Sequence, residues 1–337
     1  MPALAVAAAL RDEGAQAIFI GGERAEADLV PSAGYPLHRI SVEGLSRTNP
    51  LRAARAGARA GGAWLRARAL LRELRPAAVL GGGGYVSGPV GLAAVTRRVP
   101  LVLTEADSHL GLANRALAPF ARRVCLAFPI EGRNGDRYRV TGRPVMPAQS
   151  DRAAARTALS LEPADTCVLV FGGSLGARTI NRAAVQAFSD AAFRVLHICG
   201  RRDYPELAAR PLPPSYDLRE LMTLEDFDAA LAACDLVVAR AGGSVFEIAA
   251  HGRPAILVPY PHAAGGHQAA NASWMVRAGA AVAIPDAELT APRLAREVAQ
   301  LLADPARLAA MGHASAALAR PDAARAVAGE LLDAARR

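Results

Sequence analysis

The sequence predicts an α/β protein of two doubly wound, Rossmann-like domains, each with a parallel sheet, and a cleft between the domains. Short runs of β-branched and aliphatic residues alternate with alanine-rich helical segments nearly throughout the chain, a pattern typical of parallel strands joined by crossover helices. The length of 337 residues is ample for two such domains. The segment 142–147 carries two prolines between the two sets of strands and is interpreted as a linker. We therefore expect domains at 1–142 and 143–337.

The expected strands divide evenly between the two domains. In the first half they are Ala17–Ile20, Leu37–Val42, Ala78–Leu80, Leu101–Leu103, Val124–Ala127 and Tyr138–Val140. In the second half they are Val168–Phe171, Arg194–Ile198, Asp217–Leu221, Leu236–Ala239, Ala255–Val258 and Ala281–Ile284.

The start of the first domain departs from this pattern. Pro2 leads directly into a predicted helix at Ala3–Glu13. A doubly wound domain is expected to open with a strand and a glycine-rich turn ahead of such a helix. The hypothesis at this point is that both are absent from the chain.

The amino-acid composition restricts the classes of molecule that this protein could bind. All 39 basic residues are arginine, and the formal net charge is +8, which suits nucleic acid, an anionic membrane or phosphorylated ligands. No zinc-finger spacing or RNA-binding signature accompanies the arginines, so nucleic acid is disfavoured. The four cysteines are scattered and are interpreted as buried thiols. No apolar stretch reaches the ~18 residues of a membrane span, so a cytoplasmic or peripheral protein is expected.

Glycine-rich turns follow two strands of the second half. Gly172, Gly173 and Ser174 end a predicted strand and precede the helix Arg178–Phe188, so backbone N–H groups there could hold a diphosphate. A tight turn without a ligand is the equal alternative. A second turn, Gly242, Gly243 and Ser244, follows Arg240 after the next such strand. Two anion-friendly turns in one domain favour a nucleotide diphosphate.

Polar side chains near these turns are candidates for the rest of a nucleotide-sugar. Glu247 lies one turn into the helix after the second turn and could accept both ribose hydroxyls, or it could merely favour the helix dipole. His267 and Gln268 follow a further strand, where Gln268 could reach sugar hydroxyls or simply lie at the surface.

The first domain has its own glycine-rich turn at residues 81–84, which indicates a backbone that must approach another group. Glu105, Asp107 and His109 follow the next strand and could be acid/base groups or loop and cap residues. Asp226 and Asp228 match the DxD of metal-dependent transferases, but they begin a predicted helix at Asp226–Ala233. Acidic residues there favour the helix dipole, and we expect neither a metal nor a cofactor.

As a set, these segments resemble the MurG family of N-acetylglucosaminyltransferases of peptidoglycan synthesis, from Ala3 nearly to the end of the chain. The most specific matching segments are Glu26–Pro31, Gly83–Pro89, Gly172–Arg178, Val258–Tyr260 and His267–Gln268. The resemblance implies a GT-B fold that binds UDP-GlcNAc in the second domain and lipid I in the first. It also implies a peripheral protein at the cytoplasmic side of the bacterial membrane, with a final helix near 323–335 that returns to the first domain.

The resemblance also assigns residues. On the donor side it implies Ser174 at the diphosphate, Glu247 at the ribose, the backbone near Leu224 at uracil, Arg240 and 242–244 at the phosphates, and Gln268 with His267 at the sugar. Asp107 stands where the family has an asparagine. The acceptor side would hold Gly83, Gly84, Tyr85, Ser87 and Asn114.

Departures from the family pattern leave alternatives open. The family's GGTGGH loop, with the histidine often favoured as base, has no counterpart, and the turn before Glu247 is one residue shorter than in many relatives. The implied reaction is an inverting displacement of UDP by the lipid-linked sugar's C4 hydroxyl. The alternatives are a truncated, non-catalytic UDP-sugar-binding homologue, a GT-B transferase with another lipid or natural-product acceptor, and a UDP-GlcNAc 2-epimerase.

A cationic helix is predicted between Pro50 and Pro76. Trp64 and several leucines alternate there with seven arginines, among them Arg55, Arg59, Arg66 and Arg68. Trp64 suits the headgroup boundary of a bilayer, and the arginines suit an anionic surface. The alternative is a solvated helix face with Trp64 buried in the first domain.

Overall fold

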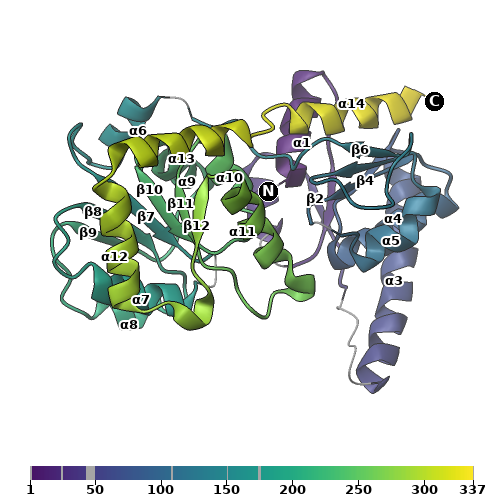
Figure 1. The fold of residues 1–337 in the computed structure, drawn as a ribbon. Helices are drawn as coiled ribbons and strands as arrows, with labels where there is room; N and C mark the ends of the chain where they lie inside the picture. Colours follow the sequence, from purple (N-terminus) through teal and green to yellow (C-terminus); the bar gives the residue numbers. More distant parts are fainter. Residues whose placement is uncertain are drawn as a thin grey trace. The chain divides into compact units, whose positions relative to one another are not determined.

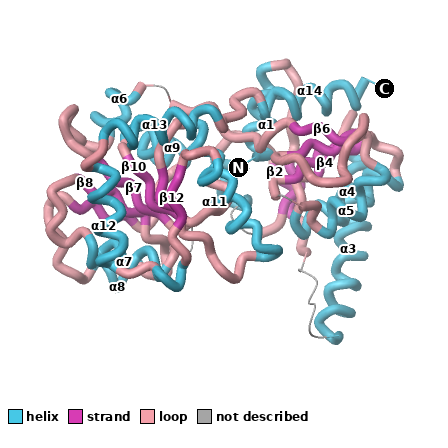
Figure 2. The backbone as a smooth tube through the Cα atoms, in the orientation of Figure 1, coloured by secondary structure: helices cyan, strands magenta, loops and turns pink. Residues whose placement is uncertain are grey.

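A computed structural model describes residues 2–23, 26–42, 50–107, 109–149, 151–173 and 176–336, and the side chains of all of these except 50–59 and 264. The chain forms two compact units. Unit 1 comprises residues 1–146 and 320–337, and unit 2 comprises residues 147–319. Figures 1 and 2 show the course of the backbone within each unit.

Unit 2 is built on one parallel sheet of six strands in the order β12-β11-β10-β7-β8-β9. The strands are β7 (Cys167–Phe171), β8 (Arg194–Ile198), β9 (Tyr216–Arg219), β10 (Leu236–Ala239), β11 (Ala255–Leu257) and β12 (Ala281–Ala283). All residues of β7, β10 and β11 are buried, as expected for parallel strands covered on both faces.

Helices cover both faces of this sheet, as Figure 1 shows, with α7, α8 and α12 along one side and α6, α9 and α13 along the other. The helices of unit 2 are α6 (Arg152–Ala158), α7 (Arg178–Ala187), α8 (Tyr204–Ala208), α9 (Leu224–Ala233), α10 (Val245–Ala250), α11 (His267–Arg277), α12 (Ala291–Leu302) and α13 (Pro305–Ala317), with short 3-10 turns η2 (Ala264–Gly266) and η3 (Asp286–Glu288).

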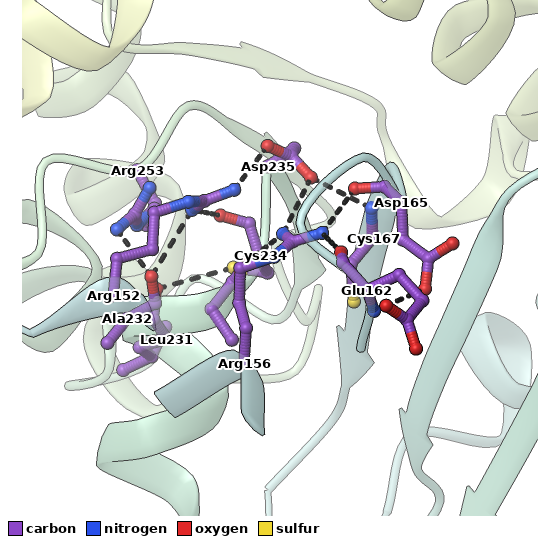
Figure 3. A network of polar contacts seen from close by, with 11 residues as sticks. Arg152, Arg156, Glu162, Asp165, Cys167, Leu231, Ala232, Cys234, Asp235 and Arg253 are labelled. Atoms are coloured by element: carbon purple, nitrogen blue, oxygen red, sulfur yellow. Dashed lines mark hydrogen bonds and ion pairs between the residues drawn. The ribbon is translucent and has the colours of Figure 1, made fainter. Parts of the chain in front are cut away.

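An arginine network fastens α6 to the amino ends of β7 and β10 (Figure 3). Arg152 donates to the carbonyl of Cys234 and pairs with Asp235 at 2.6 Å, and Asp235 accepts the backbone N–H of Cys167. Arg156, almost fully buried, donates to three more carbonyls. Burial of the nearby Cys234 raises its thiol pKa to about 12, so that group stays a neutral core residue. The network lies at the amino ends of the strands, opposite their carboxyl ends, and its role is structural.

Unit 1 contains two parallel sheets instead of one. A two-stranded sheet pairs β1 with β2, and a four-stranded sheet has the order β3-β4-β5-β6. The strands are β1 (Phe19–Gly21), β2 (Leu37–Arg39), β3 (Val79–Gly81), β4 (Leu101–Glu105), β5 (Arg123–Leu126) and β6 (Tyr138–Val140). The helices are α1 (Pro2–Asp12), α2 (Glu26–Ser32), α3 (Pro50–Leu74), α4 (Gly84–Thr96), α5 (Leu112–Leu117), η1 (Ala118–Phe120) and α14 (Ala323–Arg336).

Alternate residues of the unit 1 strands enter two separate cores. Val102 and Cys125 pack with α1 and α14, whereas Leu101, Leu103 and Val124 pack with α3 and α4. This alternation is the period-2 side-chain pattern of a strand covered on both faces. It also explains why the chain's last helix belongs to unit 1, since α14 supplies half of the first core.

Every predicted strand is present, and the ends lie within two residues of the predicted ones except in β2, which ends at Arg39, three residues before the predicted Val42. Three expectations need correction. The helix expected to begin at Asp226 begins at Leu224. Trp64 is not at an exposed boundary, because its ring packs against the α3–α4 core of unit 1. The third is the division of the unit 1 strands into two sheets.

Candidate functional site

The strand order of unit 2 marks where a ligand would bind. The chain proceeds from β7 outward through β8 and β9, then returns to β10 on the other side of β7. Ligands of open α/β sheets bind at the carboxyl ends of the strands where the order reverses. The register pairs Phe171 with Ala239, the last residues of the two strands, so the two glycine turns begin side by side.

The first turn, after β7, depends on its glycines. Gly176 has φ +76°, and a Cβ there would lie 2.0 Å from the carbonyl oxygen of Cys199. Gly173 has φ +95° with nothing within 4 Å of a Cβ, so it faces open space. The free N–H groups at the start of the ten-residue α7 follow directly. Ser174, predicted to contact the diphosphate, lies outside the described residues.

A buried chain of hydrogen bonds holds this turn against β8. Asn181 donates to the Cys199 carbonyl and to Asp203, each at 2.8 Å, and its own oxygen lies 3.1 Å from His197 Nε2. His197 Nδ1 lies 2.7 Å from the Tyr216 hydroxyl. Because the amide oxygen of Asn181 can only accept, Nε2 carries the proton and Nδ1 accepts from the tyrosine.

Electrostatics agree with that assignment. Burial lowers the pKa of His197 to about 3, despite the opposing charge of Asp203. Hydrogen bonds from Arg202 hold the pKa of the Asp203 carboxyl below its ordinary value. At neutral pH this chain of contacts therefore contains a neutral imidazole and an ionised carboxylate.

The second turn is organised by Arg240, which is 9% exposed. Its guanidinium donates to the Val258 carbonyl at 3.1 Å, to Asp286 at 2.5 Å and to the Thr179 hydroxyl at 2.7 Å. It also lies 5.4 Å from the centre of the Tyr260 ring. Arg240 therefore ties β10, β11, α7 and η3 together, and its positive charge is already shared with a carboxylate at the switch point.

Two amides fix neighbouring segments. Asn271, 2% exposed on α11, donates to the carbonyl of Ala241 at 3.0 Å and so supports the second turn from below. Gln268 accepts the backbone N–H of Tyr260 at 2.9 Å, which links the end of β11 to α11. The amide oxygen of Gln268 is therefore already engaged.

The other donor-side candidates occupy helix starts. Glu247 is half-buried in the first turn of α10, and His267 is the first residue of α11. Leu224 begins α9, which Thr223 caps by accepting the N–H of Asp226 at 3.0 Å. The Asp226 carboxylate accepts a hydrogen bond from the Thr223 hydroxyl, and it lies in the first turn of α9, where a negative charge favours the helix dipole.

In unit 1, Glu105 anchors the loop after β4. Its Oε1 accepts the N–H groups of Ala106 and Asp107, and its Oε2 accepts those of Gly111 and the Asn114 amide, at 2.8–3.3 Å. Both oxygens of the carboxylate are therefore engaged in holding the loop. This geometry favours the loop-residue interpretation of Glu105. Asp107 is half-buried and His109 is exposed.

The acceptor-side candidates separate into buried and exposed groups. Asn114, 1% exposed, lies beneath the glycine turn, 3.7 Å from where a Cβ on Gly83 would stand. Its amide donates to the Thr104 carbonyl at 2.8 Å, so Asn114 positions the turn from below. Ser87 is also buried, whereas Tyr85 is 54% exposed beside Gly84 at the start of α4.

Sequence reasoning missed the residues that position the turns. Thr179, Asn181, His197, Asn271 and Asp286 all act through contacts with residues distant in the chain, such as the 46-residue separation between Arg240 and Asp286. Asn181, in the first turn of α7, is fully buried, and a buried amide requires hydrogen-bond partners, but the sequence alone does not show this burial.

Comparisons with known proteins agree with this arrangement. The family model described as glycosyltransferase family 28 N-terminal domain matches residues 1–126, and the family 28 C-terminal domain model matches residues 167–327. Relatives named UDP-N-acetylglucosamine–N-acetylmuramyl-(pentapeptide) pyrophosphoryl-undecaprenol N-acetylglucosamine transferase occur in Moorella thermoacetica and Rubrobacter xylanophilus. The first is 41% identical, covering 97% of this chain and 93% of its own length, and the second is 42% identical, covering 98% and 99%.

Solved structures support the same conclusion. The crystal structure of MurG from Acinetobacter baumannii matches with a TM-score of 0.73 and 28% identity, covering 98% of this chain and 95% of that one. The calicheamicin glycosyltransferase CalG4, at 20% identity and a TM-score of 0.67, shares the fold. The predicted α/β architecture with parallel sheets and the predicted GT-B fold are thus confirmed, and the chain belongs to glycosyltransferase family 28 and, within it, to the MurG family of N-acetylglucosaminyltransferases.

Proposed function

We propose that this chain transfers N-acetylglucosamine from UDP-GlcNAc to the C4 hydroxyl of undecaprenyl-diphospho-MurNAc-pentapeptide, converting lipid I to lipid II. The observation that carries the proposal is the pair of glycine turns that begin side by side at the β7–β10 switch point. Membership of the MurG family supports the choice of donor and acceptor. Structural neighbours such as UDP-GlcNAc 2-epimerases, at 13–15% identity, share the fold alone and favour no second function.

In this proposal the donor binds at the carboxyl edge of the unit 2 sheet. Its diphosphate accepts N–H groups from the turn after β7 and from the start of α7, with positive charge from Arg240. Glu247 accepts the ribose hydroxyls, and the backbone at Leu224 reads uracil. Gln268 and His267 bind the sugar. The turn at 242–244 completes the phosphate site.

The reaction is a direct displacement at the anomeric carbon. The acceptor oxygen forms a bond to that carbon while the bond to the UDP oxygen breaks, and a base takes the hydroxyl proton. Backbone N–H groups and Arg240 stabilise the negative charge that develops on UDP. In unit 1, Asp107 and His109 are the proposed candidates for the base, since Glu105 is committed to its loop.

The donor-site test is calorimetry of UDP with Glu247→Ala. Loss of hydrogen bonds to a charged group should weaken binding by about 1.5–3 kcal/mol. Glu206→Ala, an exposed glutamate on α8, is the matched control and should bind like the parent. Unchanged UDP affinity in folded Glu247→Ala would remove this residue from the site.

The reaction test uses labelled UDP-GlcNAc and lipid I in detergent, with lipid II as the measured product. We expect turnover in the presence of EDTA, because Asp226 accepts the Thr223 hydroxyl at the start of α9 and Asp228 accepts the N–H of Gln149 at 3.0 Å. Turnover abolished by EDTA and restored by manganese would contradict this mechanism. UDP binding without any lipid II would favour the non-catalytic homologue.

We also propose that unit 1 docks on the anionic inner surface of the cytoplasmic membrane through α3. None of the described helices is both long and apolar enough to cross a bilayer. On α3, Arg66, Arg68 and Arg72 are exposed beside Leu65, which is 60% exposed. This mixture of cations and an exposed leucine suits a lipid headgroup layer. The side chains of Arg55 and Arg59 lie outside the described residues.

A further inference from the structure

A polar bridge joins α9 to α10 in unit 2. His251 is the C-cap residue of α10, its side chain is 3% exposed, and its Nε2 lies 2.9 Å from Oδ1 of Asp228 on α9. Its other ring nitrogen, Nδ1, lies 2.9 Å from the backbone carbonyl of Glu247. The second carboxylate oxygen of Asp228 accepts the N–H of Gln149, close to the start of unit 2 at Pro147. We call the Asp228–His251 pair the α9–α10 bridge.

The hydrogen-bonding capacity of the imidazole ring fixes the chemistry of the bridge. A backbone carbonyl can only accept, so Nδ1 of His251 carries a proton and donates to Glu247. The contact between Nε2 and Asp228 also needs a proton between the two atoms, because two bare acceptors 2.9 Å apart would repel each other. Both ring nitrogens are therefore engaged, and the ring is held between the end of α10 and the side of α9.

The bridge lies one helical turn beyond each of the two residues assigned to the nucleoside. Asp228 follows Leu224, the first residue of α9, by four positions, and His251 follows Glu247 by four positions. Residues four apart lie on the same face of an α-helix, about 6 Å apart along its axis. The bridge therefore joins the two helices directly behind the backbone proposed to bind uracil and the carboxylate proposed to bind ribose.

Other contacts fix the remaining sides of the two helices. α10 packs against α11 and α13, with Ile248 fully buried. The chain then turns at Gly252, where a Cβ would lie 3.2 Å from Cβ of Ala316 on α13. Arg253 donates to the Ala232 carbonyl at the carboxyl end of α9, at 2.7 Å. The bridge acts nearer the amino end of α9, where the proposed uracil contact is made.

We propose that Asp228 and His251 are positioning residues that set the separation between the uracil-binding start of α9 and the ribose-binding start of α10. Their role rests on the donor site of the proposed function and names what holds its nucleoside half in register. A nucleoside spans a fixed distance from base to ribose, so both contacts form at once only if the two helices keep a matching separation. Both residues act through their helices and not by contact with the donor.

Two amide substitutions separate the two contacts of the His251 ring. His251→Gln places an amide N–H near the position of Nε2 and keeps the contact with Asp228. His251→Asn places an amide N–H near the position of Nδ1 and keeps only the contact with the Glu247 carbonyl. In calorimetry with UDP, His251→Asn should bind about tenfold more weakly than the parent, and the conservative His251→Gln should bind within about twofold of it. His313→Asn, an exposed histidine on α13, is the matched control and should bind like the parent.

A double-mutant cycle tests whether the bridge acts through Glu247. His251→Asn should weaken UDP binding about tenfold in the parent but less than about threefold in Glu247→Ala, because a contact that the bridge positions is already lost there. Independent, additive losses would mean a general effect on the fold of unit 2 and would overturn the proposal. A His251→Gln variant as weak as His251→Asn would also overturn it.

The single variants distinguish this role from the donor site on which it rests. UDP affinity unchanged in both Glu247→Ala and His251→Asn would overturn the donor site and the positioning role together. Weaker binding in Glu247→Ala with parental binding in His251→Asn would overturn the positioning role alone.

Discussion

At the scale of single residues, a neutral histidine carries the strongest electrostatic prediction. His197 lies between the Tyr216 hydroxyl and the Asn181 amide, and both ring nitrogens are engaged at 2.7 and 3.1 Å. Protonation would place a second donor against the tyrosine hydroxyl and a charge in the core. The folded chain therefore resists protonation of His197 far below the ordinary pKa of 6.5.

The resulting pH dependence has a definite sign. The unfolded chain protonates His197 below about pH 6.5, but the folded chain does so only near pH 3, so stability is fully present above pH 6.5 and falls as pH decreases. The loss should reach about 2 kcal/mol between pH 6.5 and 4.5. Urea denaturation across that range should show this slope in the parent and a flatter one in His197→Gln. His313→Gln, an exposed histidine on α13, should retain the parental slope.

A parallel slope in His197→Gln and the parent would mean that other groups set the acid sensitivity. Asp203 contributes in the same direction, because its lowered pKa removes stability as pH falls further. Its effect is common to parent and variant, so the difference between them isolates the histidine.

At the scale of elements, the turn between β7 and α7 contains two glycines with positive φ but different surroundings. Gly176 is pressed against the carbonyl of Cys199, whereas Gly173 faces open space. Gly176→Ala should therefore cost both left-handed backbone strain and a backbone clash, about 2–5 kcal/mol of unfolding free energy. Gly173→Ala should cost only the strain, about 1–2 kcal/mol.

The comparison is made by urea denaturation of both variants. A smaller loss in Gly176→Ala than in Gly173→Ala would mean that the turn moves away from β8 without penalty. Such a result would also remove the physical basis for regarding this turn as a preformed phosphate site.

At the scale of the whole molecule, the question is how a chain with no described membrane-spanning helix reaches a lipid-linked acceptor. If the exposed face of α3 docks on an anionic bilayer, each arginine should add about 1 kcal/mol. Replacing Arg66, Arg68 and Arg72 with glutamine should therefore weaken binding to cardiolipin-containing vesicles by about 100-fold, with UDP affinity unchanged. Binding by the parent should weaken as salt rises, because exposed charges are screened within ~10 Å at 0.1 M.

The control replaces three exposed arginines of unit 2, Arg182, Arg296 and Arg307, with glutamine. It removes the same charge from elsewhere on the molecule. If both triple variants leave the vesicles equally, net charge and not the α3 surface governs the association.

The elements of the fold were predictable because their signals are local. Twelve strands follow from short β-branched runs, and the position of Asp226 at the start of a helix follows from the apolar residues after it. The two glycine turns were predictable as candidate binding turns, because glycines directly after a buried strand usually allow the backbone to turn tightly or to approach a ligand. Family resemblance then assigned their ligand.

The sequence by itself determined the order of strands and helices, the positions of the turns and the family, since each depends on residues close in the chain. Only the tertiary structure decided that Glu105 and Asn114 are buried supports and that Arg240 shares its charge with Asp286. Those outcomes depend on partners far apart in the chain. The periodicity of apolar residues along the chain does not reveal such partners. Once the chain folds, burial determines which polar groups must form hydrogen bonds with one another.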